Sequence, residues 1–182
     1  VDVKHRRLIF ELPGKFLAVI DELNSPNKHD YSSWFHFNPE FKLKRETSTK
    51  LVAIDKDNNK ICQIQCYDSN SNSINNIIVK GQHSPNMQGW FSHNGRELIE
   101  NIALGYPIIG KSAFFITVFD FKMEKSSKPY LRKGTNGKYI RFAFSQGDEK
   151  FDCKLITDED KREITVEING KPISVQVEFD EG

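Results

Sequence analysis

The stretch YSSWFHFNPEF, residues 31–41, predicts a β-strand with two unlike faces. Aromatic residues favour strands, and successive side chains of a strand point to opposite sides. One face would carry the core-like set Tyr31, Ser33, Phe35 and Phe37. The other would carry Ser32, Trp34, His36 and Asn38. A tryptophan beside a histidine is typical neither of a core nor of a wet surface, so this second face is the first candidate for a functional surface.

The same period of two recurs along the chain. KICQIQCY (60–67) places two cysteines and an isoleucine on one side and glutamines on the other. AFFITVFDF (113–121) is apolar on both sides, which predicts a central strand covered above and below. Asn169-Gly170, between EITVEI (163–168) and PISVQVEF (172–179), is the strongest short hairpin signal. The outward residues of that hairpin would be Thr165, Glu167, Ser174, Gln176 and Glu178.

Roughly a dozen short strands separated by turn residues predict an all-β fold with little helix. The expected architecture is an antiparallel β-sandwich, supersandwich-like, in which RELIENIAL (96–104) is also strand rather than helix. Residues 1–122 would form the sandwich core. Residues 123–138, which are polar and basic, would be an exposed loop or a linker. Residues 139–182 would supply terminal strands that complete or extend the sandwich.

Composition excludes some classes of function. The 182 residues include 26 Lys and Arg against 25 Asp and Glu, whereas a nucleic-acid-binding domain is usually strongly basic. No apolar run is long enough to span a membrane. Cys62 and Cys66 would lie about 13 Å apart on one strand, beyond the reach of a disulfide. These two and Cys153 are therefore interpreted as core thiols.

The five histidines, at positions 5, 29, 36, 83 and 93, show no metal-ligand spacing, although folding could bring two or three together. The sequence therefore predicts no metal and no cofactor. Asp21 and Glu22 are adjacent, so on a strand they point to opposite faces and cannot flank one glycosidic bond. They are interpreted as structural.

Four segments in order carry a family resemblance: VKHRRLIFELPGKFLAVIDEL (3–23), HDYSSWFHFNP (29–39), QGWFSHNGRELIENIAL (88–104) and FFITVFDF (114–121). This order resembles the C-terminal β-sheet domain of the heparinase II/III-like proteins. In that family an HRR-type strand leads into a strand ending in Asp-Glu. A histidine-bearing FHF-P strand, a G-W-x-S loop and a strand with a central Thr follow. Residues 139–182 match no part of this pattern.

The resemblance implies a polysaccharide lyase that acts on uronic-acid polymers such as heparan sulfate or alginate. In such enzymes a base removes the C5 proton, and the glycosidic oxygen leaves by β-elimination. Much of the machinery comes from a preceding α/α toroid, and the metal-binding H-x-D segment precedes the HRR strand. Neither is present here, so we expect a non-catalytic portion of a lyase, with the missing toroid as its partner domain. Free cysteines favour a reducing compartment whereas such lyases are often exported, so the localisation stays open.

The candidate substrate-binding residues are Trp34, His36, His29, Arg7, Trp90 and His93. Aromatic rings stack under the apolar faces of sugars, and guanidinium forks match sulfates and carboxylates. His29 is expected in a loop that reaches the area of Trp34. Each candidate also has a structural alternative: indoles packed under loops, histidines hydrogen-bonded to neighbouring strands, and Arg6 or Arg7 paired with Asp21 or Glu22.

A basic segment around Lys125, Lys128, Arg132 and Lys133 could hold an anionic polymer, or could simply be solvated. Two functions follow from the sequence. The chain either walls a cleft for acidic polysaccharide, or is a structural sandwich that docks on a partner domain without binding sugar. A contiguous apolar patch around Trp34 would favour docking, whereas isolated rings with polar neighbours would favour sugar binding.

Overall fold

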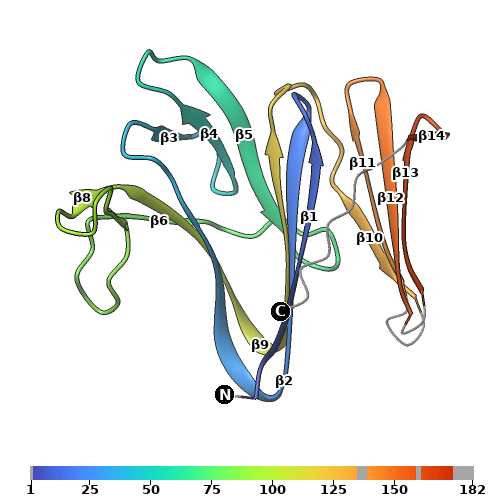
Figure 1. The fold of residues 1–182 in the computed structure, drawn as a ribbon, viewed down its shortest axis with the longest axis horizontal. Coiled ribbons are helices and arrows are strands. Elements are labelled where there is room, and N and C mark those ends of the chain that lie inside the picture. The colour runs from blue at the N-terminus through green and yellow to red at the C-terminus, as the bar shows by residue number, and fades with distance from the viewer. Residues whose placement is uncertain (1, 135–138, 159–160, 174–182) are drawn as a thin grey trace. The chain divides into compact units, whose positions relative to one another are not determined.

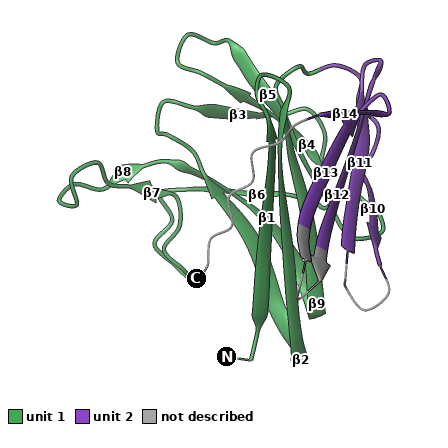
Figure 2. Ribbon diagram, turned by 45° about the vertical axis from the view of Figure 1, so that its right-hand side comes forward, with its two compact units in different colours: residues 1–123 green, residues 124–182 purple. Residues whose placement is uncertain are grey.

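The computed structural model describes residues 2–134, 139–158 and 161–173 (Figure 1). They contain fourteen β-strands and no helix, so none of the described residues forms a helix that could cross a membrane. Every named strand pair is antiparallel, and the all-β fold is confirmed. The chain divides into two compact units, unit 1 (residues 1–123) and unit 2 (residues 124–182), which Figure 2 shows in different colours.

Unit 1 contains one large sheet and one short hairpin. Its strands are β1 (Lys4–Leu12), β2 (Phe16–His36), β3 (Lys42–Arg45), β4 (Lys50–Ile54), β5 (Lys60–Tyr67), β6 (Ile77–Lys80), β7 (Trp90–Phe91), β8 (Ile99–Glu100) and β9 (Ile102–Asp120). The large sheet has the order β1-β2-β9-β5-β4-β3, and β6 also pairs with β9. Strands β7 and β8 form the separate hairpin, so the segment 96–104 contributes strand as predicted.

The long strands β2 and β9 bend together, which divides the sheet into two arms (Figure 1). In the first arm, Phe16–Asn24 pairs with Ser112–Asp120. In the second arm, His29–His36 pairs with Ala103–Gly110. The register shifts between Asn24 and His29, and proline is tolerated at such irregularities because it has no N–H to contribute to the ladder. Pro26 lies in this shift.

The inner faces of the two arms pack against each other, so one bent sheet encloses a core of its own. Phe35 of the second arm meets Phe119 of the first edge-to-face, with ring centroids 5.2 Å apart. Tyr31 and Ser33 are buried, and Phe35 and Phe37 are partly buried against the same core. The core face predicted for residues 31–37 is therefore confirmed.

The predictions for the central strand and the cysteines are also confirmed. On β9, Phe114, Ile116 and Val118 on one side, and Phe115 and Thr117 on the other, are all buried. All three cysteines are free and buried, and burial raises the pKa of each thiol to about 12.

Unit 2 is a five-stranded antiparallel sheet in chain order. Its strands are β10 (Tyr130–Lys133), β11 (Tyr139–Gln146), β12 (Glu149–Asp158), β13 (Lys161–Ile168) and β14 (Lys171–Ile173). One face is apolar and buried, with Ile140, Phe142, Phe144, Phe151, Cys153, Leu155 and Val166. Asn169 and Gly170 both have positive φ, at 51° and 73°, which is the turn that an Asn-Gly hairpin requires. The predicted outward residues Ser174, Gln176 and Glu178 lie outside the described residues.

One expectation is corrected in unit 2. The segment 123–138, predicted as a basic loop or linker, contains strand β10, which pairs with β11 from Tyr130↔Ala143 to Lys133↔Ile140. Four residues, Tyr-Leu-Arg-Lys, are too few for alternation to be read from the sequence. Hydrogen bonding to a neighbouring strand fixes them as strand instead.

Candidate functional site

The second face predicted for residues 31–38 belongs to a three-stranded surface, which we call the Trp34 face. Trp34 of β2 and Ile77 of β6 both pair with Gly105 of β9, so the side chains of all three strands project on one side there. Alternation then defines the full set. The Trp34 face comprises Ser32, Trp34 and His36 of β2, Ala103, Gly105, Pro107 and Ile109 of β9, and Ile77 and Val79 of β6.

The indole of Trp34 covers the backbone of Gly105. A Cβ added at Gly105 would lie 2.6 Å from Cζ3 of Trp34 and within 2.8 Å of two more ring atoms. Real Cβ atoms do not approach another atom so closely, so the ring occupies this place only because the residue beneath it is glycine. Trp34 is half-buried there, and part of the ring is therefore left open to a ligand or a partner.

The rest of the Trp34 face mixes exposed apolar and polar groups. Ile77 and Ile109 are 42% and 64% exposed, and Pro107 is also exposed. Ser32 and His36 are exposed beside them. The surface thus has aromatic and aliphatic area for a sugar ring or another protein surface, and hydrogen-bonding groups at its side.

On the inner side of the bend, a buried carboxylate joins three segments of chain. Asp21 of the first arm is 1% exposed. Arg7 of β1 donates to it twice, Nε to Oδ1 at 2.6 Å and Nη2 to Oδ2 at 2.9 Å. His5 Nε2 lies 2.8 Å from Oδ1, and the hydroxyl of Ser33, on the second arm, donates to Oδ2 at 2.8 Å. We call these four residues the Asp21 cluster.

The Asp21 cluster holds its carboxylate ionised. Burial acts to raise the pKa of Asp21, but hydrogen bonds from Arg7, His5 and Ser33 outweigh it and hold that pKa below its ordinary value. The hydrogen bond to Asp21 also raises the pKa of Arg7. Because Ser33 and Asp21 belong to different arms, the cluster ties the two arms together across the core.

Arg7 and its neighbours form ion pairs within the sheet, which agrees with their structural alternative. Arg7 pairs with Asp21, whereas Arg6 pairs with Glu22, its Nε lying 3.1 Å from Oε2, on the opposite side of the sheet. Asp21 and Glu22 thus point to opposite faces as predicted. The guanidinium fork of Arg7 is directed at Asp21, away from the Trp34 face.

His29 differs from the expectation. It lies within β2 rather than in a loop, because the strand continues through the register shift. Alternation from the pair His29↔Gly110 places it on the side of Tyr31, opposite to Trp34 and His36. Its Nε2 lies 3.0 Å from the hydroxyl oxygen of Ser25, and its ring lies 5.7 Å from that of Tyr31. The structure therefore does not bring His29 to the area of Trp34.

Trp90 and His93 belong to the β7–β8 hairpin and the loop within it. Trp90 is half-buried, donates from Nε1 to the carbonyl of Gln82 at 3.0 Å, and packs on the ring of His83 at 4.7 Å between centroids. This agrees with the packed alternative for Trp90. His93 is exposed, with its ring 6.4 Å from that of Phe91.

Gly89 explains why a glycine precedes Trp90. It has a φ of +76°, and a Cβ there would lie 2.8 Å from the carbonyl oxygen of Asn101. Its own carbonyl accepts hydrogen bonds from the amides of Gly81 and Asn101.

Across the ranges that the structure describes, no group of three or more His, Cys, Asp or Glu side chains is placed to bind a metal ion.

The fold defines this chain as an all-β domain built of antiparallel sheets. The family described as "Heparinase II/III-like, C-terminal" matches residues 1–102, which is more than half of the chain. The chain therefore belongs to this family, which confirms the resemblance seen in its sequence.

Solved structures agree on the fold. "Heparinase III-BT4657 gene product" has a TM-score of 0.64 at 15% sequence identity, and the match covers 86% of this chain and 24% of that one. The same protein with methylated lysines has a TM-score of 0.65 at 15% identity, with the same coverage. The chain thus spans about a quarter of the length of these structures. No curated protein sequence matches it.

Proposed function

We propose that the chain is the non-catalytic C-terminal β-sandwich portion of a lyase that cleaves uronic-acid polysaccharide by β-elimination. In this proposal the Trp34 face is one wall of the substrate cleft, and a toroid domain of the same protein supplies the catalytic groups. Membership of the heparinase II/III-like family supports the class of reaction. The observation that carries the role of this chain is the half-buried indole of Trp34, held over Gly105 beside the exposed His36.

Each residue of the wall has a chemical task. The ring of Trp34 stacks under the apolar face of a sugar, and His36 and Ser32 bind hydroxyl or carboxylate groups at its edge. Among the other candidates, Arg7, His29 and Trp90 direct polar atoms at Asp21, Ser25 and Gln82. We therefore assign the direct sugar contact to Trp34 and His36, and an outer contact to the exposed His93.

A second function remains as the alternative, and one observation favours it. Ile77 and Ile109 on the same face are 42% and 64% exposed, which is the apolar area that a docking surface for another protein domain requires. In this alternative Trp34 is buried by a partner domain and never touches sugar. The two functions make opposite predictions for the isolated chain, because only the first gives Trp34 a ligand of its own.

Tryptophan fluorescence distinguishes them, since the chain has two tryptophans. A Trp90→Phe variant leaves Trp34 as the sole indole, and a Trp34→Phe variant is the matched control. Titration with acidic oligosaccharides should change the emission of Trp34 saturably and leave that of Trp90 unchanged. An unchanged Trp34 emission across heparin, chondroitin sulfate, hyaluronan and alginate oligosaccharides would reject sugar binding and favour docking. The chain alone should release no unsaturated uronate from any of them.

A further inference from the structure

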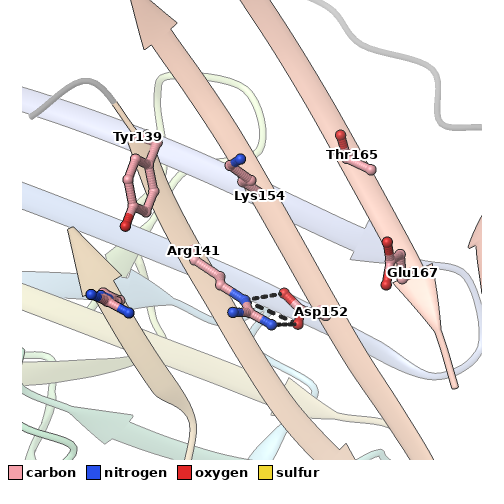
Figure 3. A pocket seen from close by; sticks show the side chains of 7 residues that line it. Tyr139, Arg141, Asp152, Lys154, Thr165 and Glu167 are labelled. Carbon is pink, nitrogen blue, oxygen red and sulfur yellow. Dashed lines mark hydrogen bonds and ion pairs between the residues drawn. The ribbon is translucent and has the colours of Figure 1, made fainter. Parts of the chain in front are cut away.

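The polar face of the unit 2 sheet carries three cations in a line. Arg132 of β10 is directly opposite Arg141 of β11, and Arg141 is directly opposite Lys154 of β12. We call these three residues the basic row (Figure 3 labels Arg141 and Lys154). All three are exposed. Neighbouring strands are about 4.8 Å apart, so the basic row extends over about 10 Å across the sheet.

Such a row is unfavourable for the sheet itself, because like charges directly opposite each other on neighbouring strands repel. Asp152 relieves part of this repulsion through a hydrogen-bonded ion pair with Arg141, in which Nε lies 2.8 Å from Oδ1. Among the described residues, no ion pair forms with Arg132 or Lys154. Within the part of the chain that the structure describes, Arg132 and Lys154 are thus available to an external anion.

The surface around the basic row has the shape and composition of a shallow binding site. A depression of about 430 Å³ is lined by Arg132, Tyr139, Arg141, Asp152, Lys154, Thr165 and Glu167 (Figure 3). The ammonium of Lys154 lies 5.5 Å from the ring centre of Tyr139. Tyr130, two residues before Arg132 on the same face, is 51% exposed. Aromatic rings therefore lie beside the cations.

We propose that this face of unit 2 binds a segment of acidic polysaccharide, with its sulfates or carboxylates on the basic row. The guanidinium group of Arg132 matches such anions in bidentate geometry, Lys154 adds a point charge, and Arg141 contributes charge while it stays paired with Asp152. The rings of Tyr130 and Tyr139 offer apolar faces to the sugars. Asp152 and Glu167 beside the row repel anions and so confine the chain to it.

Two features identify a polysaccharide as the occupant. The depression is lined by Tyr139 as well as by cations, and Tyr130 lies on the same face of the sheet, which suits a ligand with both apolar ring faces and anionic groups. The net charge of the whole chain is only +1, which is unlike proteins that bind nucleic acid through bulk charge. The inference rests on the ligand class of the proposed function, but it uses a surface that shares no residue with the Trp34 face.

Calorimetric titration of the 182-residue chain with heparin oligosaccharides tests the inference. The test variant is Arg132→Gln, Lys154→Gln, which retains the Arg141–Asp152 pair. The matched control is Lys56→Gln, Lys171→Gln, which removes two exposed charges outside the basic row. Circular dichroism should show both variants folded, because all four side chains are exposed. A third variant, Trp34→Ala, His36→Ala, reports on the Trp34 face.

We expect the test variant to bind about tenfold more weakly at low salt, since it loses two charge-assisted contacts. Its plot of log affinity against log salt concentration should also be shallower by about two, by the same counterion release that governs other polyanions. The control should retain the wild-type affinity and slope.

Each other result has a definite meaning. Equal losses in the test variant and the control would show unspecific charge attraction and overturn the inference, as would wild-type affinity in the test variant. Loss of binding only in the Trp34→Ala, His36→Ala variant would support the proposed function and overturn the inference. Loss only in the test variant would support the inference and remove the assignment of Trp34. Absence of any binding to heparin, chondroitin sulfate, hyaluronan or alginate would overturn both.

Discussion

Removing Arg7 should destabilise unit 1 more than removing its partner Asp21. The side chain of Asp21 is 2% exposed, whereas that of Arg7 is 43% exposed. Arg7→Met therefore leaves a buried carboxylate without its strongest partner, whereas Asp21→Asn leaves a guanidinium that can turn to water. Breaking a buried pair costs about 3–5 kcal/mol when the remaining charge stays buried. Because His5 and Ser33 still bind Asp21, we expect about 3 kcal/mol for Arg7→Met.

Asp21→Asn should cost less, about 1–2 kcal/mol, since an amide oxygen can still accept from Ser33 and only the charge-assisted part is lost. Urea unfolding at pH 7 followed by circular dichroism gives both values from the midpoints, provided that the slopes agree. A matched control is Arg6→Met, which breaks the pair with Glu22, a carboxylate whose side chain is 15% exposed. Its cost should be no more than about 1 kcal/mol.

The pH dependence of stability tests the direction of the pKa shift of Asp21. In the wild type the pKa of Asp21 is held below its unfolded value, so the stabilisation is complete above the unfolded pKa of about 4 and is lost as the pH falls through the folded pKa. In Arg7→Met, burial is less opposed and should raise the pKa of Asp21. The loss in free energy of unfolding of Arg7→Met, relative to the wild type, should therefore shrink as the pH falls from 7 towards 4. The reasoning would be refuted if Asp21→Asn lost as much free energy of unfolding as Arg7→Met, or more. It would also be refuted if the loss in Arg7→Met did not depend on pH.

Three further predictions concern the backbone and the thiols. Gly105→Ala should push the Trp34 ring off the sheet, and tryptophan emission should shift to longer wavelength; an unchanged spectrum would contradict the close contact. Gly89→Ala should lower the free energy of unfolding by about 1–3 kcal/mol and speed exchange of the Asn101 amide, because the positive φ of Gly89 and the nearby carbonyl oxygen of Asn101 both oppose a Cβ. Exchange at the wild-type rate would argue against this turn. Native thiols should resist iodoacetamide at pH 8 and react after unfolding, since burial raises their pKa to about 12; rapid native labelling would contradict this for Cys62, Cys66 and Cys153.

The sequence predicted what depends on local alternation. Tyr31, Ser33, Phe35 and Phe37 do face a core, and the Asn169-Gly170 turn does close a hairpin. These patterns need no knowledge of distant strands, since the period of a strand and the geometry of a two-residue turn are set by neighbours in the chain. The placement of Trp34 opposite the core was predicted for the same reason.

What the sequence did not predict depends on register between distant segments. The sheet bends because the register between β2 and β9 shifts between Asn24 and His29. Alternation within β2 alone cannot show that the strand continues through this shift. The contact of Ser33 with Asp21 follows from that bend. His29 was misplaced because its Pro- and Asn-rich surroundings have the composition of a loop.

The basic row illustrates the same limit. Arg132 belongs to a basic segment of the sequence, whereas Arg141 and Lys154 lie in two separate strands, where each is one charged residue among others. Only the pairings of β10 with β11 and of β11 with β12 bring the three together. A hairpin register counted outward from the turn at Gly147 would have aligned Arg141 with Lys154, and this is the signal that was available.

Binding of the chain to immobilised acidic polysaccharides at low and high salt tests the central claim, that the Trp34 face is a sugar platform. Stacking on an indole is little screened by salt, whereas binding through exposed cations is strongly screened. The account predicts that one polysaccharide stays bound at high salt and that Trp34→Ala, His36→Ala abolishes this salt-resistant fraction. Binding that disappears with salt, or that persists in the variant, would contradict the claim and make the Trp34 face a contact for a partner domain.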